Sequence, residues 1–213
     1  MSFIPDYAVI APFAIATIII AITPGPDMTL FVGRALAQGP AAGLATMFGT
    51  MCGCMIHTTL VVVGLSALIV ASPEAFLALK IGGAGYLVFL AWQAIWKGSA
   101  FNPESRRSGR KSLWRNFLAG VGVNLVNPKI ILFFMTFLPQ FVSVDDPHAS
   151  AKLFFLGFLF VLVSLPLTIP MVLAAHGFAG LLRRSKRVTR VVDYLFACVF
   201  SAFAIRILTA QAK

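Results

Sequence analysis

Charged residues are scarce in this chain. Asp, Glu, Lys and Arg together make up 11% of its 213 residues, whereas 59% of the residues are hydrophobic. That composition excludes an ordinary soluble domain. The apolar residues form runs of roughly twenty or more, which are long enough to cross a bilayer as helices, and no run alternates as barrel strands do. We therefore predict an all-α, polytopic protein embedded in a lipid bilayer.

The sequence also lacks the motifs of several other protein classes. It contains no Walker loop, no nucleophile–base motif and no cluster of metal ligands. We therefore expect no enzyme, no cofactor, no bound metal and no ATP-driven transport on this chain. Cys52, Cys54 and Cys198 lie within apolar segments, where we expect them to pack as small residues. The first apolar segment has no basic region or cleavage site of the signal-peptide type, so we expect it to be retained.

Acidic residues number only seven, against 17 basic ones, and the formal net charge is +10. In a soluble protein this balance would suggest a nucleic-acid partner. Here the basic residues gather in short loops, where they orient a membrane protein, and we expect no nucleic acid. The positive-inside rule makes those loops cytoplasmic, so both termini should face outward. Twelve of the 17 basic residues lie in three such loops: Arg34; Lys97, Arg106, Arg107, Arg110, Lys111 and Arg115; Arg183, Arg184, Lys186, Arg187 and Arg190.

The apolar runs predict six transmembrane helices within a single transmembrane domain, residues 1–213. The expected spans cover about 7–33, 41–70, 75–96, 114–142, 151–176 and 190–210. Small residues such as Gly49 and Gly53 in the second span allow helices to cross closely, either within the chain or across a homodimer.

The first and fourth spans are each interrupted near the middle, by Thr23-Pro24-Gly25-Pro26-Asp27 and by Asn124-Leu125-Val126-Asn127-Pro128-Lys129. Proline removes a backbone donor and disfavours helix at the preceding residue, so we expect two half-helices in each span. Pro26 and Pro128 are 102 residues apart, and the same offset aligns Asp27 with Lys129. Three spans per half then imply two repeats of opposite orientation, residues 1–100 and 101–213, with the broken helices as counterparts.

We expect the two breaks to form a substrate site, because paired interruptions of this kind lie at the site in transporters. A charge such as that of Lys129 costs about 2.5–3.5 kcal/mol at the centre of an inserted helix. Pairing Asp27 with Lys129, or sharing both charges with a zwitterion such as an amino acid, would offset much of that cost. A purely structural ion pair is the alternative. The candidate substrate-binding residues are Pro24, Gly25, Pro26, Asp27, Asn124, Asn127, Pro128 and Lys129, with Lys80 as a further candidate.

Two titratable residues inside other spans have two interpretations each. Lys80 lies about two turns inside the third span and either contributes to the site or extends its ammonium to the outer interface. His57 lies within the second span. It is either a buried neutral side chain bonded to a neighbour or, together with Asp27, part of a route for coupling protons.

Several sequence motifs occur together in this chain. They are Thr23-Pro24-Gly25-Pro26-Asp27, Leu79-Lys80-Ile81-Gly82-Gly83-Ala84-Gly85-Tyr86-Leu87, Asn127-Pro128-Lys129 with Leu132-Phe133-Phe134, and Phe137-Leu138-Pro139-Gln140-Phe141. In these motifs the chain resembles the LysE/RhtB family of bacterial amino-acid exporters. The resemblance covers nearly the whole chain, and the motifs occur in the family's order. It implies a secondary exporter in the cell inner membrane, driven by protons, with an amino acid of the homoserine, threonine or leucine type, or a derivative, as its substrate. The residue after the second proline of the first motif varies in the family, so the resemblance supports Asp27 less securely than Lys129.

Three other functions remain open at this point. An exporter of metal or other inorganic ions would need paired acidic or thiolate ligands, and only Asp27, Cys52 and Cys54 offer them. A membrane-embedded enzyme would need a nucleophile–base pair or a metal cluster. A channel would need a polar stripe along a pore, whereas the polar residues here gather at the two breaks.

Overall fold

The computed structural model describes residues 4–71, 112–143 and 146–175, with isolated helical positions between 81 and 96 and between 187 and 202. Within these ranges every regular element is helical, as the composition predicts. The first half contains α1 (Tyr7–Ile22), α2 (Pro26–Gln38) and α3 (Pro40–Ala71). The second contains α5 (Leu113–Leu125), α6 (Pro128–Leu132), a π-helical segment η1 (Phe133–Phe137), a 3-10 segment η2 (Leu138–Phe141) and α7 (Ala149–Leu173).

Up to four membrane spans lie within the described residues. Pro40–Gly64 of α3 and Ala149–Leu173 of α7 are each long and apolar enough to cross a bilayer. The pair α1–α2 passes the same test together, and so does α5 with Pro128–Phe141, which combines α6, η1 and η2; the bends at the two breaks are 52° and 55°. The predicted third and sixth spans, and Lys80, lie for the most part outside the described residues. The number six therefore stays a prediction.

Proline sets the position of both breaks. Thr23, the C-cap of α1, and Asn127, the N-cap of α6, have extended backbone at ψ 121° and 109°, and Pro24 and Pro128 follow them directly. Pro26 and Pro128 are the first residues of α2 and α6, where a missing N–H costs nothing. The predicted first span ends at 33, but α2 continues to Gln38. The helix ends there because Gly39 takes φ +97°, a conformation that favours glycine.

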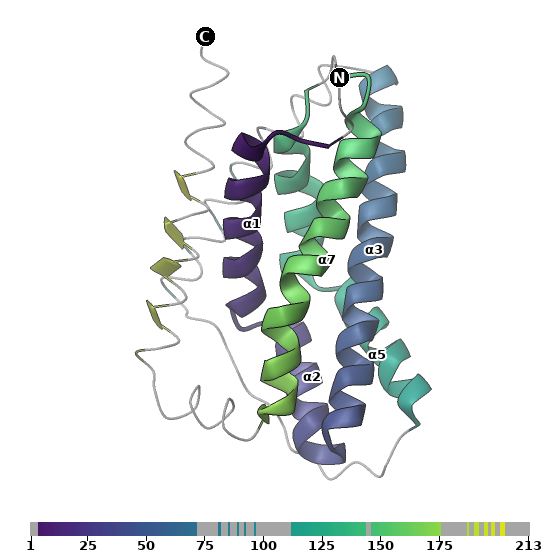
Figure 1. The fold of residues 1–213 in the computed structure, drawn as a ribbon, viewed down its shortest axis with the longest axis vertical. Helices are drawn as coiled ribbons and strands as arrows, with labels where there is room; N and C mark the ends of the chain where they lie inside the picture. The colour runs from purple at the N-terminus through teal and green to yellow at the C-terminus, as the bar shows by residue number, and fades with distance from the viewer. Residues whose placement is uncertain are drawn as a thin grey trace.

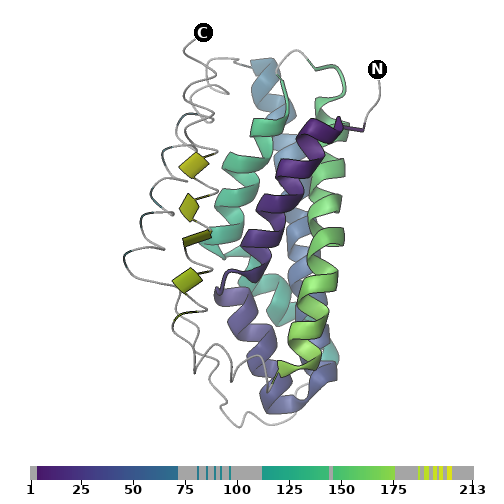
Figure 2. The same cartoon turned by 60° about the vertical axis from the view of Figure 1, so that its left-hand side comes forward.

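The two broken helices run in opposite directions. In Figure 1, α1 and α2 lead from the end that carries the N-terminus to the opposite end, and α5 lies at that opposite end before the chain returns through α6. Figure 2 shows the same arrangement after a turn of 60°. Opposite directions are what an inverted repeat requires. The repeat itself stays a prediction, because each half would include a further span whose residues are mostly not described.

Glycines bring α3 and α5 into backbone contact. A Cβ on Gly49 would collide with the main-chain carbonyl of Phe117, and a Cβ on Gly120 would collide with that of Thr46. One turn further on, a Cβ on Gly53 would occupy the place of the Asn124 side chain. The small residues of the second span therefore pack within the chain. This crossing places Asn124, the last polar residue of α5, directly against α3.

Two apolar clusters lie on either side of the breaks. The aromatic cluster joins α1, η1 and the first half of α7 through ring contacts, with Phe13, Phe133, Phe134, Phe137 and Phe160 as members. The methionine cluster joins α2, the first half of α3 and the end of α7, with Met28, Phe31, Met47, Met51 and Val172 as members. Figure 1 places the elements of the first cluster toward the N-terminal end and those of the second toward the opposite end.

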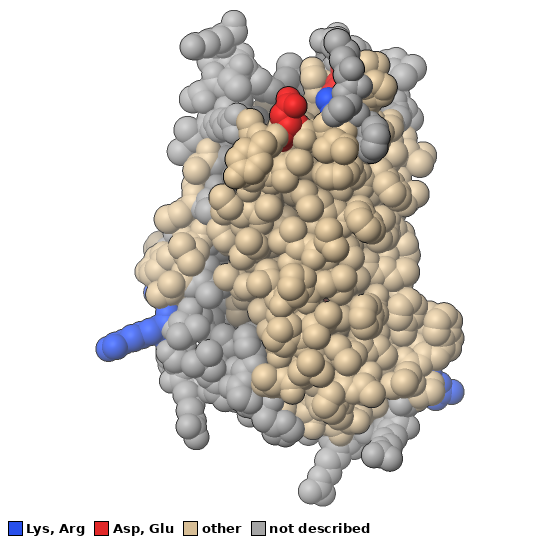
Figure 3. Space-filling model, in the orientation of Figure 1, with Lys and Arg blue, Asp and Glu red and all other residues tan. Residues whose placement is uncertain are grey.

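One face of the described surface has an uncharged band between its two ends. On the face shown in Figure 3, the acidic side chains lie at the upper end, and the basic side chains lie there and in the lower half. Large apolar side chains of the described helices, such as Leu60, Val63 and Leu162, are exposed at 55–65% of their full accessible area. Such a band suits the hydrocarbon core of a bilayer.

Candidate substrate site at the helix breaks

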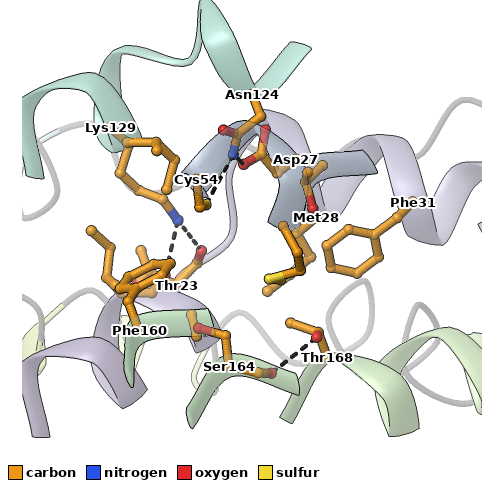
Figure 4. A pocket seen from close by; sticks show the side chains of 15 residues that line it. Thr23, Asp27, Met28, Phe31, Cys54, Asn124, Lys129, Phe160, Ser164 and Thr168 are labelled. Carbon is orange, nitrogen blue, oxygen red and sulfur yellow. Dashed lines mark hydrogen bonds between the residues drawn. The ribbon is translucent and has the colours of Figure 1, made fainter. Parts of the chain in front are cut away.

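The two breaks meet at a small cavity inside the bundle, with a volume of about 40 Å³. Its polar wall carries Asp27, Asn124 and Lys129 beside Thr23 and Cys54, and Ser164 and Thr168 of α7 lie opposite (Figure 4). Its apolar wall is formed by Ile20, Ala21, Met28, Phe31, Met51, Ile130 and Phe160. Residues far apart in the sequence therefore face one another where the half-helices end.

The ammonium of Lys129 is bound by main-chain carbonyls at the end of α1. Nζ donates to the oxygen of Thr23 at 2.7 Å and to that of Ile20 at 3.0 Å. In a continuous helix the Ile20 carbonyl would accept from residue 24, but Pro24 has no N–H to donate. The C-terminal end of a helix also carries negative partial charge, which favours a cation. Lys129 thus satisfies a carbonyl that the first break leaves without its helical donor.

Asp27 lies in the first turn of α2, where the helix end favours a negative charge. Its Oδ2 accepts a hydrogen bond from the Asn124 amide at 2.7 Å, and its buried Oδ1 has no hydrogen-bond partner among the described residues. Both Asp27 and Lys129 are described, and they form no direct ion pair. The sequence left open whether the two charges pair. In the structure each charge is bound to other groups, and both face the same cavity.

Asn124 connects Asp27 to His57. Its side-chain amide also lies 3.5 Å from the Cys54 sulfur, and its main-chain carbonyl lies 3.3 Å from Nε2 of His57. The residue four positions on is Pro128, which has no N–H, and the same carbonyl accepts from the Asn127 N–H at 3.0 Å instead. His57 is buried and its ring stacks on Phe134. A continuous set of polar contacts therefore runs from α3 through the end of α5 to α2.

The other predicted residues shape the site from outside the cavity. Asn127 caps α6 by accepting from the Lys129 N–H at 3.1 Å, and its buried Nδ2 meets no hydrogen-bond acceptor within the described ranges. Gly25 lies against the lysine, since a Cβ there would come within 3.2 Å of Nζ. Pro24 is buried, whereas Pro26 and Pro128 are exposed and set the backbone without lining the cavity. Lys80 lies outside the described residues.

Several lining residues were missed in the sequence. Thr50 and Cys54 are one turn apart on one face of α3, and the predicted candidate His57 continues that face three residues further on without lining the cavity. Ser164 and Thr168 are likewise one turn apart in the apolar α7, and the Thr168 hydroxyl donates to the Ser164 carbonyl. Polar residues at helical spacing in an apolar span were a usable signal for both sets.

Comparison with known proteins identifies the class and then the family. The fold and site are those of a polytopic helical membrane protein with a polar centre between broken helices. The sequence model of the LysE type translocator family matches residues 18–211, so the chain belongs to that translocator family.

Relatives of this chain occur in different bacteria. The uncharacterized membrane protein YrhP of Bacillus subtilis is 29% identical over 147 residues, which cover 65% of this chain and 70% of YrhP. The leucine efflux proteins of Salmonella choleraesuis and Salmonella typhimurium are each 25% identical over 199 residues, covering 93% of this chain and 94% of theirs. No solved structure matches the chain.

Proposed function

We propose that this protein is a secondary exporter of neutral amino acids with apolar side chains, leucine among them, across the inner membrane. The observation that carries the proposal is that Lys129 and Asp27 face one cavity without forming an ion pair. A zwitterion presents one group of each sign, separated by a single carbon atom. Two separate opposite charges beside an apolar wall match that chemistry.

The zwitterion would exchange contacts with the protein. Its carboxylate would take the ammonium of Lys129 away from the carbonyls of Ile20 and Thr23. Those carbonyls, and Oδ1 of Asp27, which has no hydrogen-bond partner in the part of the chain that the structure describes, would then accept from the substrate ammonium. Each polar group would keep a partner during binding, which avoids leaving a buried group unsatisfied.

The apolar wall favours an aliphatic side chain. Met28, Met51, Ile130 and Phe160 line the cavity opposite or beside the charges. Methionine is flexible enough to adapt to side chains of different shape. The leucine efflux proteins, which match almost the full length of the chain, support a substrate of this kind.

The cavity must widen to admit such a substrate. A volume of about 40 Å³ is enough for a few water molecules but not for an amino acid. We propose that the aromatic cluster and the methionine cluster separate the site from the two sides of the membrane and open in turn. With the basic loops cytoplasmic, the aromatic cluster is the outward barrier.

Protons are the proposed driving ion. Asp27 and His57 both contact Asn124, and a carboxylate and an imidazole are side chains of the kind that carry protons in transporters. A proton entering while the amino acid leaves would couple export to the membrane's proton gradient.

The test is efflux from proteoliposomes loaded with a labelled amino acid. We expect leucine to leave faster than threonine or homoserine, and lysine to be retained. An acidic exterior should accelerate leucine efflux, and an ionophore that collapses the gradient should remove the acceleration. The variant Lys152→Ala, which loses only the contact with Asp146 at the edge of α7, is the matched control and should behave as the unmodified protein. Absence of amino-acid efflux contradicts the proposal, and efflux that ignores both pH gradient and membrane potential indicates a facilitator.

A further inference from the structure

The binding site of the Lys129 ammonium is made by the backbone of another element. Both acceptors, the carbonyls of Ile20 and Thr23, belong to the end of α1, far from Lys129 in the sequence. Main-chain carbonyls at the ends of half-helices are also the groups that bind monovalent cations in transporters, and rings of carbonyls bind K⁺ in channels. The distances of 2.7 and 3.0 Å suit an ammonium or an ion of similar size.

A positive charge at this place has a physical cause. Pro24 deprives the Ile20 carbonyl of its helical donor, and the end of α1 concentrates negative partial charge there. Ile20, Ile130 and Phe160 line the same cavity, so their side chains limit the water that can reach the carbonyls. Without a cation these oxygens would be buried acceptors with few partners, which is unfavourable.

We propose that the end of α1 is a monovalent-cation site in which the Lys129 ammonium is the resident ion, attached to the protein by its own side chain. Asp27, which faces the same cavity without an ion pair to Lys129, supplies the compensating charge. Because the Lys129 ammonium occupies the site, the protein needs no free metal cation at the breaks. Removing the lysine head should convert the place into a site for a free cation.

Gly25 provides space for the resident ion. Its backbone is extended at φ −166°, a conformation open to any residue, so its conformation gives no reason for a glycine here. A Cβ would lie 3.2 Å from Nζ and 3.4 Å from Cε of Lys129. Glycine at this position therefore leaves room for the Lys129 ammonium, and a branched side chain would fill the space that the ion occupies.

The test measures cation binding without any amino acid. Purified Lys129→Ala is unfolded by heat in detergent, at constant ionic strength, in methylammonium, potassium, sodium or N-methylglucamine chloride. We expect methylammonium and potassium to raise the Tm of Lys129→Ala by roughly 2–4 °C in a saturable manner. N-methylglucamine is too large to enter and should have no effect. The unmodified protein should show no such difference between the salts.

A double variant provides the control. In Lys129→Ala with Gly25→Val, the valine should fill the site and abolish the response. Equal shifts in the unmodified protein, or a response that survives the double change, would place cation binding elsewhere and overturn the proposal. A folded Lys129→Ala whose Tm is the same in every salt would also overturn it. If Lys129→Ala is recovered only in methylammonium or potassium, the site is supported; failure to recover it in all salts contradicts it.

The cation site can be tested without the proposed function, and only its role in transport rests on that function. Cation binding by Lys129→Ala in a protein that exports no amino acid would support the site and contradict the function. Export of leucine by the unmodified protein, with no cation response in Lys129→Ala, would support the function and contradict the cation site.

Discussion

The side-chain amide of Asn124 donates a 2.7 Å hydrogen bond to Oδ2 of Asp27 and thereby ties the end of α5 to the first turn of α2. The two residues come from the two different breaks, 97 positions apart. Because the asparagine side chain is uncharged, it binds the Asp27 carboxylate without neutralising it, so the charge stays available to a ligand. The role of the charge can be tested separately from the role of the hydrogen bond.

Replacing Asp27 by asparagine should remove export while keeping the protein folded. The new amide oxygen can still accept from Asn124, so only the charge is lost. We expect the efflux rate per correctly inserted protein to fall roughly tenfold or more, because the substrate ammonium loses its counter-charge. The same change at Asp6, which is exposed and makes no side-chain cap, is the control and should leave export unchanged. Normal export by Asp27→Asn would exclude a role for this charge.

Lys129→Ala should abolish export with little effect on insertion. The carbonyls of Ile20 and Thr23 each lose a partner, at a cost of about 1–3 kcal/mol. Removing a charge from the middle of a span recovers about 2.5–3.5 kcal/mol, which offsets much of that loss. Lys129→Arg should restore little export, because a planar guanidinium does not fit a place shaped for a compact ammonium. Efflux is measured together with the amount of inserted protein; near-normal export by Lys129→Ala would leave the lysine with a structural role.

A pair of glycine variants in α5 tests the helix crossing. Gly120→Ala places a methyl group against the Thr46 carbonyl, and we expect the free energy of unfolding to fall by about 1–3 kcal/mol. Gly122→Ala, two residues further on, meets no atom within 4 Å and should raise stability by about 0.5–1 kcal/mol through better helix propensity. Unfolding of both purified variants in denaturant is the measurement. Equal stabilities for the two variants would contradict a backbone contact at Gly120.

Reporter fusions test the predicted orientation. A fusion at residue 108 should report a cytoplasmic location, whereas fusions at residue 147 and at the C-terminus should report the outside. The expectation follows from the twelve basic residues placed on one side and from six spans. A cytoplasmic C-terminus would contradict both the six-span topology and the inverted repeat.

The sequence was most informative where a local rule decides the structure. Pro26 and Pro128 begin their half-helices at the residues expected, because a proline's effect depends only on its immediate neighbours. For Lys129, the sequence indicates the type of acceptor, a free main-chain carbonyl at a helix break, but not which residues make the contact. Pro24 shows that a carbonyl is left free, but the identity of the cation depends on how two distant segments pack.

Other parts of the site depend on packing that no local pattern encodes. The link from Asn124 to His57 exists because Gly49 and Gly120 let α3 and α5 approach closely enough. The apolar wall formed by Met28 and Phe160 depends in the same way on how α2 and α7 lie across the bundle. In an apolar span nearly every residue is a candidate for such a wall, so hydrophobicity alone does not select these two.

The close contact of α3 and α5 at their glycines also bears on which parts of the molecule can move. Two helices whose backbones touch at Gly49 and Gly120 have no side chains between them that could change rotamer and let them slide. We therefore expect the pair α3–α5 to be the stationary frame, which carries His57, Cys54 and Asn124 with it. Widening of the cavity would then come from the elements on its other side, α1, α2 and α7. Lys129, at the start of α6 beyond the second break, follows this frame in the chain and contacts the end of α1, one of the elements expected to move.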